Sequence, residues 1–258
     1  MLKPKVCILR SAGTNCDAET ASAFKLAGAD TELVHINSLI KGARSLDEFQ
    51  ILALSGGFSY GDDVASGKIF ANELRFKLAD SLRKFIKDKK LIIGICNGFQ
   101  ILVKSGLLPD SAGMDQDTSL IINDSGKFED RWVYLKPSGR CIWTKNLKKI
   151  IYLPVAHGEG KFVTRDKDIL SRLKKNKQIV FEYCDAAGKE AKYPVNPNGS
   201  IENIAGICDP TGRILGLMPH PERHVSSLQH PRNWNLKSKE GDGLQIFKNG
   251  VDYVKENL

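Results

Sequence analysis

The chain has 258 residues, 41% of them hydrophobic and 26% charged, which is enough apolar material to bury a core without disulfides or metal. It contains no run of 18 apolar residues and no signal-peptide pattern, so we expect a cytoplasmic protein without a membrane span. Its formal net charge is +8, but the lysines form short runs without a nucleic-acid-binding motif. We therefore expect a solvated basic face and no nucleic-acid partner.

The first half of the chain alternates short apolar runs with segments of helical spacing. Strands are predicted at residues 5–10, 31–36, 50–54 and 91–95, and helices at residues 17–27, 72–87 and 97–104. Strand–helix–strand repeats at this spacing indicate βαβ units and a mainly parallel sheet. Functional sites in such sheets lie at the carboxyl ends of strands, which here are the segments after positions 54, 95 and 218.

The second half is less regular. Strands are predicted at residues 119–122, 131–135, 150–153, 161–164, 178–183, 204–208 and 213–218, and helices at residues 168–174 and 244–254. The turn sequence at 209–212 indicates a β-hairpin. No repeat, linker or low-complexity tract interrupts the chain, so a single domain over residues 1–258 is the simplest interpretation.

Neither a metal nor a cofactor is expected in this chain. The six cysteines form no CxxC pair, which excludes the usual zinc spacings and favours reduced, mostly core thiols. The segment from Gly61 is not a P-loop, because five residues separate it from Gly67 and Ile69 replaces the required hydroxyl residue.

The strongest local signal is the segment GICNGFQ, which begins at Gly94 between a buried strand and a helix. It is the cysteine counterpart of the nucleophile elbow, in which small residues flank a nucleophile on a tight strand-to-helix turn. The positive N-terminal end of the helix favours negative charge on the Cys96 sulfur. The amide of Asn97 follows the nucleophile and is a candidate oxyanion donor. A core cysteine beside a strand end is the competing interpretation.

Two further strand ends carry matching chemistry. Paired glycines follow the strand that ends at position 54, and the amide of Gly57 is a candidate second oxyanion donor. The segment GLMPHPE, which begins at Gly216, presents His220 and then Glu222 after a strand. Histidine suits proton transfer from a thiol to a leaving amine, and a carboxylate orients its ring.

Five segments together resemble one family. They are SGGFSYGD from Ser55, CNGFQ from Cys96, AHGEG from Ala156, NPNGS from Asn196 and GLMPHPER from Gly216. The cysteine elbow with His-Pro-Glu resembles the class I (triad) glutamine amidotransferases. All five segments resemble the glutaminase subunits of phosphoribosylformylglycinamidine synthase, which belongs to de novo purine synthesis.

This resemblance implies a three-layer α/β/α fold with an open, mainly parallel sheet of the flavodoxin-like type. It implies a triad of Cys96, His220 and Glu222 that hydrolyses glutamine to glutamate and ammonia through a γ-glutamyl thioester on the cysteine. Ammonia then passes to a separate ATP-dependent synthetase subunit, where ATP and Mg²⁺ are expected, and a small third subunit often bridges the pair.

The resemblance also implies which groups surround the substrate. The amides of Gly57 and Asn97 form the oxyanion hole, and Gln100 helps to hold the substrate glutamine. The backbone around Ala156 and Gly158 lines the same pocket.

Some features leave alternatives open. His157 is either a loop residue that shapes the pocket or a structural histidine. Residues 225–243 look like an insertion that docks a partner or is only a surface excursion. The rival functions are a glutaminase that serves another ATP-dependent amidotransferase, a different cysteine hydrolase and a non-catalytic regulatory binding subunit.

Overall fold

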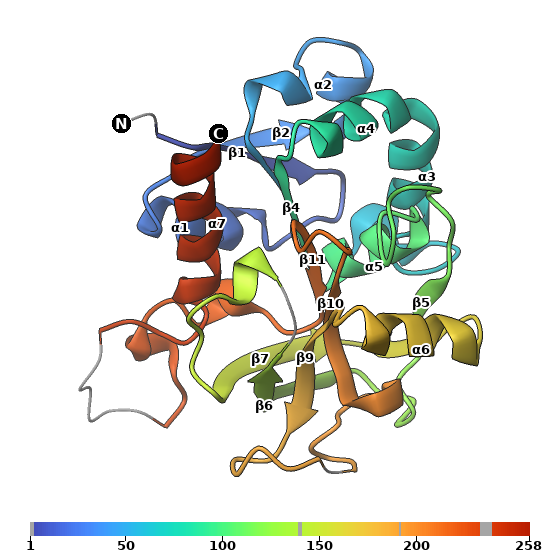
Figure 1. The fold of residues 1–258 in the computed structure, drawn as a ribbon, viewed down its shortest axis with the longest axis vertical. Helices are drawn as coiled ribbons and strands as arrows, with labels where there is room; N and C mark the ends of the chain where they lie inside the picture. The colour runs from blue at the N-terminus through green and yellow to red at the C-terminus, as the bar shows by residue number, and fades with distance from the viewer. Residues whose placement is uncertain (1–2, 139–140, 191, 233–238) are drawn as a thin grey trace.

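The computed structural model describes residues 3–138, 141–190, 192–232 and 239–258, and its centre is a nine-stranded sheet (Figure 1). Its strands lie in the spatial order β2 (Asp30–His35), β1 (Lys5–Arg10), β3 (Ile51–Leu54), β4 (Leu91–Ile95), β11 (Ile214–Leu217), β10 (Ile204–Cys208), β9 (Ile179–Cys184), β6 (Glu129–Pro137) and β7 (Ile151–His157). A second sheet pairs β5 (Thr118–Ile121) with β8 (Lys161–Thr164).

The nine-stranded sheet combines a parallel and an antiparallel half. Strands β2, β1, β3, β4 and β11 are parallel neighbours, whereas β11, β10, β9, β6 and β7 pair antiparallel. The predicted α/β fold is confirmed, and its parallel half is built from the βαβ units of the first half together with β11. The antiparallel half begins at the hairpin of β10 and β11, because so short a turn joins only antiparallel strands.

The helices lie on both sides of the parallel strands, which gives three layers. They are α1 (Asp17–Leu26), α2 (Ile36–Ile40), α3 (Lys68–Lys77), α4 (Ala79–Lys87), α5 (Asn97–Lys104), α6 (Lys167–Lys175) and α7 (Leu244–Asn257). Figure 1 shows α1 and α7 together on one side of the sheet, and α3, α4 and α5 on the other. None of the helices in the described ranges combines the length and apolar character that a bilayer crossing requires.

The helix predicted at residues 72–87 is wrong in its start and in its continuity. Two helices occupy this region and its N-terminal flank, and they meet at Leu78, whose φ of −125° and ψ of 12° are not helical. Leu78 is nevertheless buried with Leu74 and Leu82, so the apolar face continues across the change of direction. Apolar residues spaced by four continue through the break, so the periodicity did not reveal it.

Strand β7 is longer than predicted, since it continues from Ile151 to His157. Pro154 lies inside it, opposite Trp132 of β6. Proline removes a ladder donor, which an edge strand tolerates, and β7 is the edge of the sheet. His157 is therefore the last residue of a strand, and the expectation of a loop residue is corrected.

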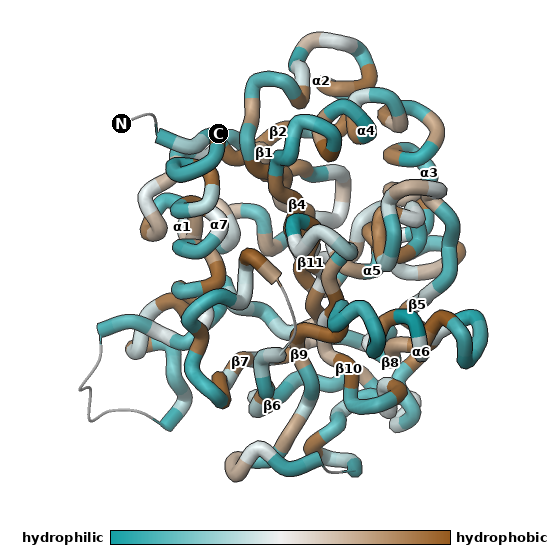
Figure 2. The backbone as a smooth tube through the Cα atoms, in the orientation of Figure 1, coloured by the Kyte–Doolittle hydropathy of each residue, from teal (hydrophilic) through white to brown (hydrophobic). Residues whose placement is uncertain are grey.

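The central strands are buried on both faces. No residue of β3, β4 or β11 is exposed, and Figure 2 shows these strands as the hydrophobic centre of the chain. This burial is typical of parallel strands that helices cover on both sides, as the apolar run at residues 91–95 predicted. The segments that follow these strands therefore start from fully buried positions.

The segment at residues 225–243 leaves the body of the chain and returns to it. Ser226 and Glu240 form an isolated β-bridge that closes the excursion. The ring of His230 packs against aromatic side chains of β6 and β7, at 5.7 and 5.3 Å between centroids. Residues 233–238 of this segment lie outside the described residues.

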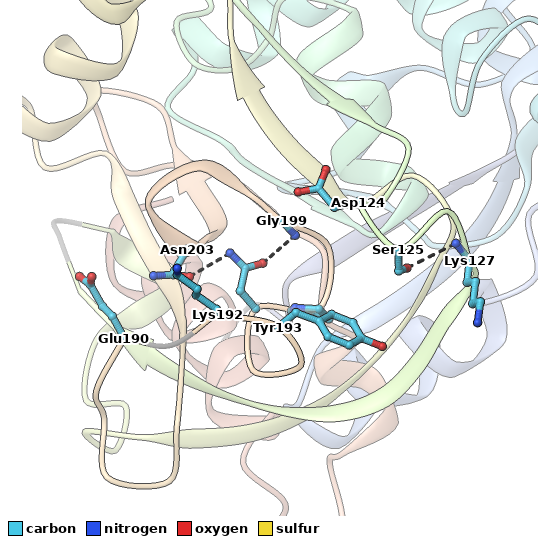
Figure 3. A pocket seen from close by; sticks show the side chains of 10 residues that line it. Asp124, Ser125, Lys127, Glu190, Lys192, Tyr193, Gly199 and Asn203 are labelled. Carbon is cyan, nitrogen blue, oxygen red and sulfur yellow. Dashed lines mark hydrogen bonds between the residues drawn. The ribbon is translucent and has the colours of Figure 1, made fainter.

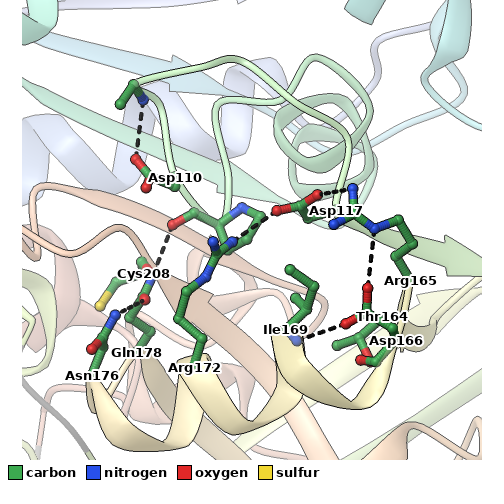
Figure 4. A network of polar contacts seen from close by, with 12 residues as sticks. Asp110, Asp117, Thr164, Arg165, Asp166, Ile169, Arg172, Asn176, Gln178 and Cys208 are labelled. Atoms are coloured by element: carbon green, nitrogen blue, oxygen red, sulfur yellow. Dashed lines mark hydrogen bonds and ion pairs between the residues drawn. The ribbon is translucent and has the colours of Figure 1, made fainter.

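Helix α6 is fixed to the loop before β5 by one buried carboxylate (Figure 4). The Oδ1 atom of Asp117 lies 2.7 Å from Nη1 of Arg165, and its Oδ2 atom accepts a hydrogen bond of 2.8 Å from Nη2 of Arg172. Asp166 caps the helix by accepting from the amide of Ile169 at 2.8 Å. Asp117 is only 8% exposed, so it links the two cations at the edge of the core.

Replacing Asp117 with alanine is expected to lower the free energy of unfolding by about 1–2 kcal/mol. Two charge-assisted contacts are lost, but both arginines are partly exposed and remain hydrated, which limits the cost. Urea denaturation followed by circular dichroism measures the change. Asp130→Ala, at an exposed position of β6, is the control and should stay within about 0.5 kcal/mol of the wild type. Equal losses in both variants would contradict the anchoring role.

Candidate active site

The three strand ends selected from the sequence lie side by side. Strands β3, β4 and β11 are consecutive parallel neighbours, with Leu54 opposite Gly94 and Leu217 opposite Ile95. Parallel strands end at the same edge of a sheet, so the segments that follow them emerge together. The segments that follow β4 and β11 are far apart in the sequence. They meet only because β11 inserts between β4 and β10.

Cys96 lies on a tight turn between β4 and α5. Its φ of 53° and ψ of −106° are strained for a residue with a Cβ, and the side chain is 5% exposed. The turn needs its glycines, because a Cβ at Gly98 would lie 1.9 Å from the carbonyl oxygen of Leu54 and one at Gly94 would lie 2.6 Å from that of Gly98. The predicted elbow geometry is therefore present around this cysteine.

His220 and Glu222 form a buried pair directly after β11. The Nδ1 atom of His220 and the Oε1 atom of Glu222 are 2.6 Å apart, and the two residues are 1% and 2% exposed. The backbone is held by the amide of His220, which donates to the carbonyl of Pro154 at 2.8 Å. The Glu222 carboxylate thus holds the ring of His220, and the edge strand β7 holds its backbone.

The pKa of His220 is raised well above its ordinary value. Burial opposes the charged form, but the Glu222 carboxylate and then the Cys96 sulfur outweigh it. The ring therefore favours the imidazolium form beside the cysteine, which is the state that protonates a leaving amine.

The cysteine and the histidine meet over Gly56. A Cβ at this glycine would lie 2.8 Å from Cε1 of His220 and 3.5 Å from Cβ of Cys96. Only a hydrogen atom fits between them, which gives the first residue of the Gly-Gly pair its physical reason. The structure thus brings together the three residues predicted as a triad.

Two backbone amides lie at the same edge with their hydrogens free. Gly57 follows Gly56 at a φ of 137°, and Asn97 is the first residue of α5, where an amide has no intrahelical acceptor. Within the described ranges, neither amide donates to a protein acceptor. Both are therefore available to an oxyanion, and their role as its donors stays a prediction.

The side chain of Gln100 connects the elbow helix to the loop after β7. Its Nε2 atom donates to the carbonyl of Glu159 at 2.6 Å, and its Oε1 atom accepts from Nδ2 of Asn97 at 2.9 Å. Ala156 contributes its carbonyl, which accepts from the Cys96 sulfur at 3.6 Å. In this state Gln100 fixes the loop that contains Gly158, and its contact with glutamine stays a prediction.

Asp62, which had no predicted role, is the centre of a half-buried hydrogen-bond network that includes Asn97 of the elbow helix. Its Oδ1 atom accepts from Nδ2 of Asn97 at 3.0 Å, and its Oδ2 atom accepts from Ser66 at 3.0 Å. Burial raises the pKa of this carboxyl, against the effect of its hydrogen bonds. In the sequence, Asp62 was recognisable only as the last residue of the SGGFSYGD segment. That position did not reveal which groups its carboxylate contacts.

His157 is a structural histidine. It is 3% exposed, and its Nδ1 atom is 3.2 Å from Oδ1 of Asn123. Its Nε2 atom faces Nδ2 of Asn198 at 3.5 Å, which explains the middle of the NPNGS segment. Burial, with a smaller effect of the charge on His220, lowers the pKa of His157 to about 3. It is therefore neutral and unsuited to act as a second base.

Cys16 lies against the predicted triad, although the sequence indicated only a core cysteine. It is 1% exposed, and its sulfur accepts a hydrogen bond of 3.1 Å from Nη2 of Arg223. Its amide and that of Asn15 donate to the carbonyl of Gly56 at 3.2 and 3.3 Å. No CxxC spacing marks this residue, and only the fold of β1 beside β3 brings it to the site.

A cavity of about 780 Å³ lies away from the triad, between the loop at residues 124–127 and the segment at residues 192–203 (Figure 3). None of the predicted catalytic, oxyanion or glutamine-binding residues lines it. At its wall, Oδ1 of Asn196 accepts from the amide of Gly199 at 3.0 Å, which closes the NPNGS turn. We therefore place the candidate active site at the strand ends and not in this cavity.

Known proteins resemble this chain along almost its whole length. A family model described as CobB/CobQ-like glutamine amidotransferase domain matches residues 3–254. The phosphoribosylformylglycinamidine synthase subunit PurQ of Dehalococcoides mccartyi is 49% identical over 99% of this chain and 100% of its own. The PurQ subunit of Archaeoglobus fulgidus is 44% identical, with 98% and 97% covered. A chain in the structure of PurLQS from Thermotoga maritima matches with a TM-score of 0.75 at 33% identity, covering 98% of this chain and 100% of that one.

Proposed function

The chain belongs to the CobB/CobQ-like glutamine amidotransferases and, within them, to the PurQ subunits of phosphoribosylformylglycinamidine synthase, and from that premise we propose how its site hydrolyses glutamine. The chain is the glutaminase subunit of this synthase. The observation that carries the catalytic assignment is the meeting of Cys96 with the buried His220–Glu222 pair at the ends of adjacent strands.

The first half of the reaction acylates the cysteine. The Cys96 thiolate attacks the side-chain amide carbon of glutamine, and the amides of Gly57 and Asn97 donate to the resulting oxyanion. As the intermediate collapses, the carbon–nitrogen bond breaks and the His220 imidazolium protonates the leaving nitrogen. Ammonia departs, and a γ-glutamyl thioester remains on the sulfur.

The second half releases glutamate. Neutral His220 now takes a proton from water, whose oxygen attacks the thioester carbon. The carbon–sulfur bond breaks, the thiolate leaves, and the imidazolium is restored. Glu222 keeps Nδ1 of the ring occupied throughout, so Nε2 exchanges the protons on the side of the cysteine.

The ammonia has a destination in a larger assembly. The matching chain from Thermotoga maritima belongs to a complex named PurLQS, and full-length similarity to it supports an equivalent assembly for this chain. In this assembly a separate synthetase subunit uses ATP and Mg²⁺, a small third subunit bridges the pair, and this chain requires no cofactor. Such a complex operates in the cytoplasm.

The thioester is directly testable. Mixing the chain and its synthetase partner with glutamine and stopping the reaction in acid is expected to leave a γ-glutamyl group on Cys96, because acid stops the base-assisted hydrolysis. Mass spectrometry of the cysteine-containing peptides locates the group. Glutamate in place of glutamine serves as the control and should give no adduct. A γ-glutamyl group on another cysteine, or turnover without any adduct under these conditions, would refute the assignment.

A further inference from the structure

The side-chain amide of Asn97 connects two loops of the site. Its Oδ1 atom accepts a hydrogen bond of 3.2 Å from the amide of Ser59, which follows Gly57 in the same loop. Its Nδ2 atom donates to Oε1 of Gln100 at 2.9 Å, and Nε2 of Gln100 donates to the carbonyl of Glu159 at 2.6 Å. The loop with one predicted oxyanion donor and the loop after β7 are therefore joined through this amide.

The orientation of the Asn97 amide depends on its neighbours, because its oxygen and nitrogen ends have the same shape. The deciding neighbour is Asp62, whose Oδ1 atom accepts from Nδ2 of Asn97 at 3.0 Å and from the amide of Gly67 at 3.3 Å. Both donors are N–H groups, so this oxygen can only accept. An acceptor at this place keeps Nδ2 of Asn97 toward Asp62 and leaves Oδ1 of Asn97 for the amide of Ser59.

The same choice passes on to Gln100. Because Asn97 presents an N–H group, Gln100 turns its oxygen toward Asn97 and its nitrogen toward the carbonyl of Glu159. Asn97 and Gln100 are only 1% and 3% exposed, so a reversed amide would leave buried polar groups without partners, which is costly. One carboxyl oxygen of Asp62 thus sets the orientation of two amides in series.

The loop of Asp62 adopts an unfavourable backbone conformation. Tyr60, Asp62 and Val64 have φ values of 55°, 55° and 71°, in the left-handed region that residues with a Cβ rarely adopt. Strain of this kind persists where surrounding contacts determine the conformation, and it clusters at functional sites. The second carboxyl oxygen of Asp62 accepts from Oγ of Ser66 at 3.0 Å. The strained turn therefore holds a carboxyl group that is fixed by both of its oxygens.

We propose that Asp62 is a positioning residue of the glutaminase, which acts through the side chain of Asn97 to orient Gln100 and to hold the loop that carries Gly57. The role needs an acceptor oxygen and not a negative charge, because the group that Oδ1 meets on Asn97 is a neutral N–H donor. It rests on the proposed function, since it concerns the groups predicted to hold the oxyanion and the substrate. The network of hydrogen bonds itself can be measured without glutamine.

Asp62→Ala is expected to lower kcat/KM for glutamine in the partner complex by about 10- to 100-fold. An oxyanion donor and a predicted substrate-binding side chain both lose their fixed positions, and outright loss of one oxyanion donor costs about 100- to 1,000-fold. Asp62→Asn should recover activity to within about threefold of the wild type. Asparagine offers an acceptor oxygen to Asn97, can donate to Ser66 and tolerates a φ of 55°.

Ser66→Ala is the matched control for this series. It removes the hydrogen bond to the second carboxyl oxygen of Asp62 but leaves the bond to Asn97, so kcat/KM should stay within about threefold of the wild type. A loss in Asp62→Asn as large as in Asp62→Ala would overturn the proposed acceptor role.

A double-mutant cycle shows whether Asp62 acts through Asn97. Asn97→Ala keeps the backbone amide of this position and removes only the side chain. In that background, Asp62→Ala should lower kcat/KM by less than about twofold further, because the group through which Asp62 acts is already absent. A further loss as large as in the wild-type background would show that Asp62 acts by another route, and would overturn the proposal.

Hydrogen exchange tests the network in the full chain without glutamine. The amide of Ser59 donates to the Asn97 side chain, so its exchange should become about tenfold faster or more in Asp62→Ala, while that of β4 stays unchanged. Mass spectrometry of peptides within residues 55–67 measures the change. Unchanged exchange at Ser59, or equally faster exchange in β4, would overturn the positioning role. A wild-type complex that releases no glutamate would instead refute the proposed function, and the exchange would still show whether Asp62 holds this loop.

Discussion

A Cys96→Ala variant is expected to lose glutamine hydrolysis, with kcat lower by about 10⁵- to 10⁶-fold, because the reaction then has no nucleophile. Alanine keeps the single Cβ that the elbow accepts at a φ of 53°, so the backbone strain and the fold should not change. Glutamate release by the variant in complex with its synthetase partner measures the loss. Supplying ammonium chloride directly should restore product formation, since the synthetase step does not use this thiol.

The matched control for this result is Cys184→Ala. This cysteine is also buried, at the end of β9, and takes no part in the site, so its variant should keep most of the activity. The Cys96→Ala chain should also still bind glutamine in calorimetry, because the predicted binding groups are untouched. Glutamate release that persists in Cys96→Ala would remove this residue from the mechanism.

A Glu222→Gln variant is expected to lower kcat by about 10³- to 10⁴-fold, as removal of an orienting carboxylate does in other triads. The carboxylate has two tasks here. It holds Nδ1 of His220 at 2.6 Å, and it raises the pKa of the ring against burial. Without it, the smaller effect of the Cys96 sulfur alone opposes the burial of a ring that is 1% exposed, so the neutral form becomes more favoured.

The sign of the pH effect follows from this change. His220 must be protonated to release ammonia, and a raised pKa keeps it protonated to higher pH. The alkaline limb of kcat/KM should therefore lie at lower pH in Glu222→Gln than in the wild type. Glu256→Gln, at an exposed position of α7, should leave both the rate and the limb unchanged. A uniform loss of rate without movement of the limb would show that Glu222 acts through ring orientation alone.

Local features of this protein were determined by the sequence itself. The bounds of α5 and β4 agree with those predicted, because an apolar run, a thiol between glycines and an amphipathic segment follow one another without a gap. The elbow, the Gly-Gly turn and the His-Pro-Glu segment were recognisable for the same reason. Each depends on backbone geometry over a few residues, and glycine and proline restrict that geometry directly.

Contacts between distant segments were decided only by the tertiary structure. The kink at Leu78 and the continuation of β7 through Pro154 depend on what each segment packs against, and their local sequences fit more than one conformation. Cys16 carries no motif, yet the pairing of β1 with β3 places it beside His220. The position of β11 between β4 and β10 decides that Cys96 and His220 meet. The order of strands in a sheet depends on the burial achieved by the whole chain. It therefore cannot be predicted from any short segment.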